Sequence, residues 1–253
     1  MKIILSPAKQ MLQEETLAPE GRPVYLEQAR QIAAWMRTLS FEEAKRLWQC
    51  SERLARENYS RLQQLDLDGF ASPAILAYDG IAYKYMAPAV FEKGQFAYVQ
   101  QNLRILSGLY GVLRPMDGVV PYRLEMQARA AVAGTKDLYH FWGRRLYEAV
   151  RDDSGVIVNL ASREYARCIE PYLTPADTYI TCVFAEREAD RLVQKGVYAK
   201  MARGEMVRYM AVRNIQSPEQ LRDFAELSYR FSPQDSDAAQ YVFVRERQAG
   251  KGR

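Results

Sequence analysis

Short apolar runs alternate with amphipathic segments along this 253-residue chain. Residues 2–5, Lys-Ile-Ile-Leu, predict a short buried strand that ends at the Ser6-Pro7 break. Between residues 26 and 65 the apolar positions recur at helical spacing, and Ser40 with Glu43 forms a capping box. We therefore expect two or three helices in a subregion at about residues 26–66.

Residue type and length assign the other apolar runs. Residues 156–160 give the clearest strand, because β-branched side chains dominate a short run bounded by Gly155 and Ala161-Ser162. Further strands are expected at 74–78, 227–231 and 241–245, with a hairpin formed by 178–186 and 191–198, and an apolar element at 103–106. Helices are expected at 81–86, 95–102, 200–212 and from Ser217-Pro218, and residues 250–253 are expected to fray.

Strands separated by both helices and hairpins predict a mixed sheet. No repeat, low-complexity tract or Pro/Gly/Ser-rich linker divides the sequence, so we expect one compact α/β (α+β) domain over residues 1–253, with the helical subregion as an insertion. No apolar run approaches the roughly 18 residues that span a bilayer, which predicts a soluble protein without membrane contact. Cys50, Cys168 and Cys182 stand far apart, which argues against a disulfide framework and favours a reducing cytoplasm.

Basic residues are unevenly distributed. The net charge is only +4, but arginine outnumbers lysine by 26 to 9, which suits a polyanionic or nucleotide partner and is equally typical of GC-rich codon usage. Residues 191–213 hold six basic side chains against one acidic one. Lys200 and Arg203 are expected at an exposed helix start, where free N–H groups attract anions, and Arg208 follows on the same helix. The alternative is a solvated basic face.

Common enzyme signatures are missing. The sequence contains no G-x-x-x-x-G-K-[ST], G-x-G-x-x-G or G-x-S-x-G motif. Its single histidine, His140, lies among aromatic residues and is expected to be a packed or half-exposed ring. Sites built from several histidines are excluded by that count, and we expect neither a metal nor an organic cofactor.

Two turns carry candidate anion contacts. Gly108-Leu-Tyr-Gly111 lies between Arg104 and Arg114, and its backbone N–H groups can face a phosphate, although a simple glycine turn explains the same residues. Ser6 and Lys9 lie just beyond the first strand and can converge on an anion, or they can form an ordinary exposed turn.

Polar residues also follow other predicted strands. In residues 121–126, Arg123 and Glu125 share one face of an extended segment and Tyr122 lies on the other. Ligands gather at the carboxyl ends of strands in α/β sheets, where Asn159 and Glu164 are expected. Lys9, Arg123, Glu125 and Asn159 are expected to converge around an anionic planar ligand. The candidate acid–base or orienting groups are Tyr122, Glu125, Asn159 and Glu164.

Five sets of residues resemble the YaaA family of bacterial peroxide-stress proteins. They are 3–9 (Ile-Ile-Leu-Ser-Pro-Ala-Lys), 103–115 with 121–126, 136–143 (Lys-Asp-Leu-Tyr-His-Phe-Trp-Gly), 158–162 with Glu164-Tyr165, and 198–204 (Tyr-Ala-Lys-Met-Ala-Arg-Gly). The similarity runs from Met1 to about Arg247. It implies a cytosolic DNA-binding role in hydrogen peroxide stress and supplies no established reaction.

The turn at 108–111 resembles the turn of a helix-hairpin-helix module, which grips the DNA backbone without reading sequence. The resemblance therefore implies binding to duplex or branched DNA, with phosphate contacts from Lys9, Arg104, Arg114, Lys200, Arg203 and Arg208. The alternative is an enzyme that acts on a nucleobase, a nucleotide or a similar small anionic substrate in a cleft. Convergent, buried Glu, Tyr and Lys side chains favour the enzyme, and a broad basic face favours DNA binding.

Overall fold

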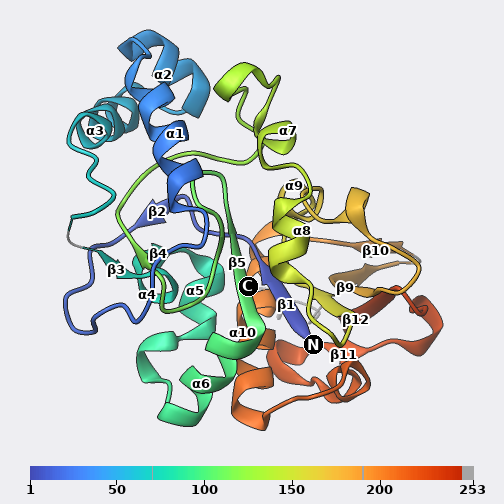
Figure 1. Cartoon of the computed structure of the whole chain (residues 1–253). Helices are drawn as coiled ribbons and strands as arrows, with labels where there is room; N and C mark the ends of the chain where they lie inside the picture. Colours follow the sequence, from blue (N-terminus) through green and yellow to red (C-terminus); the bar gives the residue numbers. More distant parts are fainter. Residues whose placement is uncertain (70, 190, 247–253) are drawn as a thin grey trace, which may run out of the picture.

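A mixed sheet forms the centre of the protein in the computed structural model, which describes residues 1–69, 71–189 and 191–246 (Figure 1). The sheet has eight strands in the order β11-β12-β9-β8-β1-β5-β6, and β10 pairs with β9. The pairings β5–β1–β8–β9–β12 are parallel, whereas β6, β10 and β11 join their neighbours antiparallel. The predicted mixed α/β fold is confirmed.

The strands of this sheet are β1 (Lys2–Leu5), β5 (Leu103–Ser107), β6 (Gly111–Leu113), β8 (Val156–Asn159), β9 (Thr178–Glu188), β10 (Arg191–Val193), β11 (Arg230–Phe231) and β12 (Gln240–Glu246). Two small antiparallel pairs lie outside it: β2 (Gln10–Met11) with β4 (Tyr78–Asp79), and β3 (Ser72–Pro73) with β7 (Gly118–Val119). The central strand β1 is covered on both faces, and Ile3 and Ile4 have no exposed surface. Such burial explains its continuous apolar sequence.

The helices are α1 (Leu26–Arg37), α2 (Phe41–Trp48), α3 (Glu52–Gln63), α4 (Ala74–Ala77), α5 (Ile81–Met86), α6 (Lys93–Asn102), α7 (Leu138–Trp142), α8 (Arg145–Val150), α9 (Arg163–Ala166) and α10 (Gly196–Arg213). Short 3₁₀ turns occupy Pro88–Val90, Val132–Gly134, Glu170–Tyr172, Pro218–Asp223, Glu226–Ser228 and Pro233–Asp235. Helices α1, α2 and α3 lie together at one end of the molecule (Figure 1). The predicted capping box of α2 is present, with Ser40 and Glu43 exchanging hydrogen bonds.

Three local predictions are wrong. Residues 74–78 form one helical turn and only then a two-residue strand, because a short apolar run fits either buried structure. The strand predicted at 191–198 ends at Val193, since α10 already begins at Gly196. The strand predicted at 227–231 is reduced to Arg230–Phe231. The predicted fraying at residues 250–253 lies outside the described residues.

Helix α10 packs closely against α5. A Cβ atom at Gly204 would lie 1.8 Å from the carbonyl oxygen of Ala82, so only glycine allows the two backbones to approach this far. This contact fixes α10 against α5, the helix that follows β4. It thereby positions the face of α10 that carries Lys200 and Arg203.

Of the helices in the described ranges, none combines the length and the apolar character needed to cross a bilayer. The three cysteines are free thiols, and Cys168 and Cys182 are buried.

Candidate functional site

A cavity of about 390 Å³ opens where β1 and β8 end. Its walls come from segments far apart in the sequence: residues 5–10 after β1, 79–83 at the start of α5, 122–125, 160–165 after β8, and Lys200 and Arg203 of α10. Two parallel strands thus deliver their following turns to the same edge of the sheet, which is the usual ligand position in such folds.

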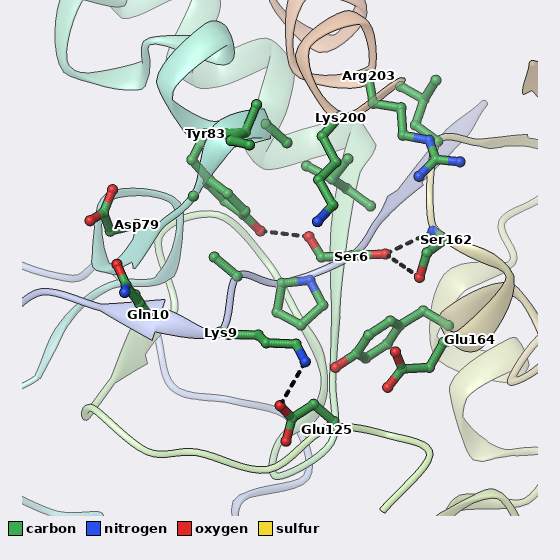
Figure 2. A pocket seen from close by; sticks show the side chains of 18 of the residues that line it. Ser6, Lys9, Gln10, Asp79, Tyr83, Glu125, Ser162, Glu164, Lys200 and Arg203 are labelled. Carbon is green, nitrogen blue, oxygen red and sulfur yellow. Dashed lines mark hydrogen bonds and ion pairs between the residues drawn. The ribbon is translucent and has the colours of Figure 1, made fainter. Parts of the chain in front are cut away.

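Ser6 joins the two strand ends. Its Oγ accepts a hydrogen bond from the Ser162 N–H (2.8 Å) and donates one to Ser162 Oγ (3.2 Å). The Tyr83 hydroxyl donates to the Ser6 carbonyl oxygen (3.1 Å), as Figure 2 shows. These bonds hold the Ser6-Pro7 turn on both sides. Lys9 follows the turn, and its side chain is mostly exposed.

Glu125 lies between two cations. Its Oε1 is 3.2 Å from Lys9 Nζ and 3.0 Å from Arg123 Nη2. The Lys9 side chain is 65% exposed and that of Arg123 only 9%, so Arg123 is the buried partner of the carboxylate. Trp48 Nε1 donates to the Arg123 carbonyl oxygen (2.6 Å), which ties this segment to α2.

Glu164 lies on the same side of the cavity as Glu125 (Figure 2). One of its oxygens accepts the Gln127 N–H (3.2 Å). Burial raises the pKa of Glu164, and the neighbouring Glu125 charge raises it further, against the opposing effect of the Gln127 N–H. Glu164 thus keeps its proton to a higher pH than an exposed glutamate does.

Tyr122 is part of a buried hydroxyl network. Its OH lies 2.9 Å from Tyr78 OH and 2.6 Å from Ser107 Oγ, which also accepts the Tyr110 N–H. Burial raises the pKa of Tyr122 to about 12. The phenol is therefore neutral near neutral pH, and this network holds Tyr122 in place in the cavity wall.

Lys200 and Arg203 form the opposite, cationic wall, and both side chains point towards Ser6 and Ser162 (Figure 2). Lys200 is exposed, whereas burial lowers the pKa of Arg203. Within the described ranges the buried Nε of Arg203 has no hydrogen-bond partner. The buried thiol of Cys182 lies close enough to act on Arg203, and burial raises the pKa of this thiol to about 12, so it is not a counter-ion.

The position of this wall corrects one expectation. Helix α10 begins at Gly196, so Lys200 and Arg203 lie about one and two turns beyond the helix start. Arg203 is also not an exposed surface residue, because its guanidinium group is largely covered. The positive charge of this wall therefore comes from the two side chains and not from free N–H groups at a helix terminus.

Asn159 does not join the cavity. It is only 3% exposed, its amide oxygen accepts the Ala161 N–H (2.9 Å), and its amide nitrogen donates to Thr181 Oγ1 (3.2 Å). The structure thus brings together Lys9, Arg123 and Glu125 of the expected cluster and turns Asn159 towards β9. Asn159 is a structural residue that terminates β8.

The other expected phosphate contacts are scattered. Arg104 is 8% exposed and donates to the carbonyl oxygens of Leu103 (2.8 Å) and Gln100 (3.3 Å). Arg114 is exposed beyond the end of β6, and Arg208 lies on α10 outside the cavity lining. None of these three side chains is among the described residues that line the cavity.

The glycine turn at 108–111 differs most from its expected role. Strands β5 and β6 flank it, and its residues are buried, so it is a tight β-hairpin and not a helix-hairpin-helix element with a backbone free for phosphate. A Cβ atom at Gly108 would lie 2.5 Å from the Leu124 carbonyl oxygen. The turn thus supports the backbone that carries Glu125, which gives Gly108 a positioning role in the cavity wall.

Tyr83, Asp79 and Tyr165 also line the cavity and were not among the predicted site residues. Asp79 lies between the strand predicted at 74–78 and the helix predicted at 81–86, and an isolated tyrosine in a helix carries no positional signal. His140 is half exposed and its ring Nδ1 lies 2.6 Å from Asp137, the cap of α7. The described residues contain no cluster of three or more His, Cys, Asp or Glu side chains that can hold a metal ion.

The fold and the cavity define a class of α/β proteins whose site lies at the carboxyl ends of parallel strands. Residues 1–235 match the family model described as peroxide stress protein YaaA, and the chain belongs to this family. It is 52% identical to a UPF0246 protein of Agathobacter rectalis, over 97% of this chain and 99% of that protein. It is 50% identical to a UPF0246 protein of Desulfitobacterium hafniense, over 97% and 98% of the two chains.

Proposed function

We propose that the protein is an enzyme that takes a nucleobase, a nucleotide or a similar small anionic substrate into the cavity at the ends of β1 and β8. One observation carries this proposal: separate segments bring both cations and carboxyl groups to one cavity, among them Lys9, Lys200, Arg203, Glu125 and Glu164. A protein that only covers a DNA backbone needs cations and no enclosed pair of carboxyl groups.

The two carboxyl groups have different surroundings. Glu125 lies against Lys9 and Arg123, whereas burial raises the pKa of Glu164. Two carboxyl groups that one cavity holds in different surroundings are candidates for general acid and general base roles. Glu164 is the proposed proton donor and Glu125 the proposed acceptor or orienting group.

Titration calorimetry with a panel of nucleobases, nucleosides and nucleotides tests the proposal. We expect saturable binding of an anionic member of the panel, which Lys200→Gln weakens by about tenfold, the usual effect of one charge-assisted hydrogen bond. Arg208→Gln is the matched control, because it removes a cation from the same helix outside the cavity. Equal weakening by both variants, or no binding of any member of the panel, contradicts the proposal.

A second proposal is DNA binding through the backbone, in the setting of peroxide stress that the family defines. The observation in its favour is that Lys200, Arg208 and Arg213 on α10 form no ion pair with another described residue, while Lys9 is exposed nearby. Cations that lack internal partners on one helix suit phosphate contacts.

Binding to duplex and branched DNA at several salt concentrations tests this second proposal. Each phosphate contact adds about one unit to the slope of log affinity against log salt. Both Arg208→Gln and Lys200→Gln should therefore reduce the slope, while only Lys200→Gln affects small ligands. A slope near zero in the unmodified protein excludes backbone binding.

A further inference from the structure

The two ends of the cavity differ in charge. At one end Lys200 and Arg203 face the hydroxyl groups of Ser6 and Ser162 (Figure 2). At the other end Glu125 lies against Lys9 and Arg123, with Glu164 on the same side. A ligand that spans the cavity therefore needs an anionic group at one end and hydrogen-bond donors at the other.

Arg203 most strongly limits which group can bind at the cationic end of the cavity, which Lys200 and Arg203 form. A guanidinium group has five N–H donors in a planar fork and stays charged. Burial of such a group is unfavourable unless an anion pairs with it. Among the described residues no carboxylate pairs with Arg203, and its Nε is buried without a partner.

Lys200 adds a second, exposed charge about one turn away on the same helix. A planar fork and a point charge that point at the same place suit a tetrahedral oxyanion with several acceptor oxygens, because such a group can accept from both. Ser6 is already bonded to Ser162, so its hydroxyl has a fixed position at this end. A phosphate meets these requirements better than a single carboxylate.

The acidic end suits the edge of a nucleobase. Glu164 uses one oxygen for the Gln127 N–H, and Glu125 directs one oxygen at Lys9 and Arg123. The remaining oxygen of Glu125, and that of Glu164 in its ionised form, can accept from neighbouring N–H groups such as N1–H and N2–H₂ of guanine. The rings of Tyr83, Tyr122 and Tyr165 also line the cavity and offer planar apolar surface.

We propose that the cavity holds one nucleoside monophosphate unit, with its phosphate against Lys200 and Arg203 and the N–H-bearing edge of its base against Glu125 and Glu164. The volume of about 390 Å³ lies within the range of small-molecule sites. This inference rests on the proposed small-ligand function and adds the ligand class and its orientation. The same unit can come from a free nucleotide or from one unpaired nucleotide of a DNA strand.

The test compares GMP with guanosine in the full-length protein. We expect GMP to bind at least about tenfold more tightly than guanosine, and Lys200→Gln to remove most of that ratio while leaving guanosine affinity unchanged. Glu164→Gln should leave the ratio of GMP affinity to guanosine affinity unchanged. It should reduce the preference for GMP over UMP. Arg208→Gln should change neither ratio, because Arg208 lies outside the cavity lining.

The result that overturns the inference is an equal affinity for GMP and guanosine, or a ratio that Lys200→Gln leaves intact. If inorganic phosphate binds in a Lys200-dependent manner but no nucleotide does, the small-anion function stands and the nucleotide assignment is wrong. If nothing in the panel binds, both fail. A duplex with one unpaired guanine, compared with a fully paired duplex, identifies the source: a Lys200-dependent preference for the unpaired guanine assigns the unit to DNA, and a preference for free GMP assigns it to the soluble pool.

Discussion

Arg104 and Arg203 are both largely buried arginines, and burial lowers the pKa of both. Their surroundings differ. Arg104 donates to two backbone carbonyl oxygens, and the charge of Asp117 acts on it. Arg203 faces a cavity, and its buried Nε has no partner in the part of the chain that the structure describes.

The difference separates a structural cation from one available to a ligand. The Arg104 region is internally neutralised: Lys2 reaches the Gln101 carbonyl oxygen (2.7 Å) and Asp152 (3.4 Å), and Asp117 accepts the Arg114 N–H (2.8 Å). Among residues 1–69, 71–189 and 191–246, Arg203 has no such internal partner for its buried Nε. Sequence alone gives both arginines the same weight as phosphate contacts, whereas in the structure only Arg203 of the two lines the cavity.

The largest expected effect comes from moving the helix that carries Arg203. In Gly204→Ala the new methyl group would lie 1.8 Å from the Ala82 carbonyl oxygen, so α10 and α5 must separate. We expect a loss of about 3 kcal/mol in unfolding free energy, at the upper end for overpacked sites. Urea denaturation measures it. Gly196→Ala is the control, because a Cβ there meets nothing within 4 Å, and a similar loss in both variants would disprove the backbone-contact explanation.

The buried carboxyl group of Asp117, in the Arg104 region, should make the unfolding free energy depend on pH. Burial raises the pKa of Asp117 to about 6, against the opposing charges of Arg114 and Arg104. An acid with a raised folded pKa stabilises the protein below its unfolded pKa, and this stabilisation is lost as the pH rises towards 6. We expect the stability difference between the unmodified protein and Asp117→Asn to change by about 2 kcal/mol between pH 4 and pH 7. Parallel pH profiles in urea denaturation would refute this prediction.

Replacing the two arginines tests the comparison directly. Arg104→Met leaves the Gln100 and Leu103 carbonyl oxygens without their donor and should cost about 1–2 kcal/mol. Arg203→Met keeps most of the side-chain volume and removes a buried charge that has no internal counter-ion, so stability should stay within about 0.5 kcal/mol or increase. Unfolding midpoints at one pH and one salt concentration give both values. An equal loss in the two variants would make Arg203 structural and remove the argument for an anion site.

Much of the fold could be predicted because it follows from local pattern. The strands at 2–5 and 156–159, the capping box at Ser40 and the helix at 81–86 each have a complete signal within a few residues. The run at 74–78 does not, since four apolar residues suit one helical turn and a buried strand equally well.

The site was predictable where a residue follows a strand and unpredictable where side-chain direction matters. Lys9, Glu125 and Glu164 reach the cavity because their segments follow or flank sheet strands. Asn159 lies at the same edge of the sheet, where β8 ends. Its side-chain amide points towards β9, because it donates a hydrogen bond to Thr181. The glycine turn at 108–111 gave a correct turn signal, and only tertiary packing shows that the backbone at Leu124 covers it.

The smallest expected effect concerns Lys9. Its ammonium group lies 3.2 Å from Glu125, but the side chain is 65% exposed, so water and salt screen the pair. Lys9→Gln should change the unfolding free energy by less than about 0.5 kcal/mol, because exposed ion pairs contribute little and Arg123 still holds Glu125. Thermal unfolding measures this, with Lys84→Gln as control, since Lys84 makes a similarly exposed pair with Asp79 (3.2 Å). A loss for Lys9→Gln clearly larger than for Lys84→Gln would show that Lys9 holds the cavity wall in place, and its exposed charge would then belong with the structural cations of the Arg104 region.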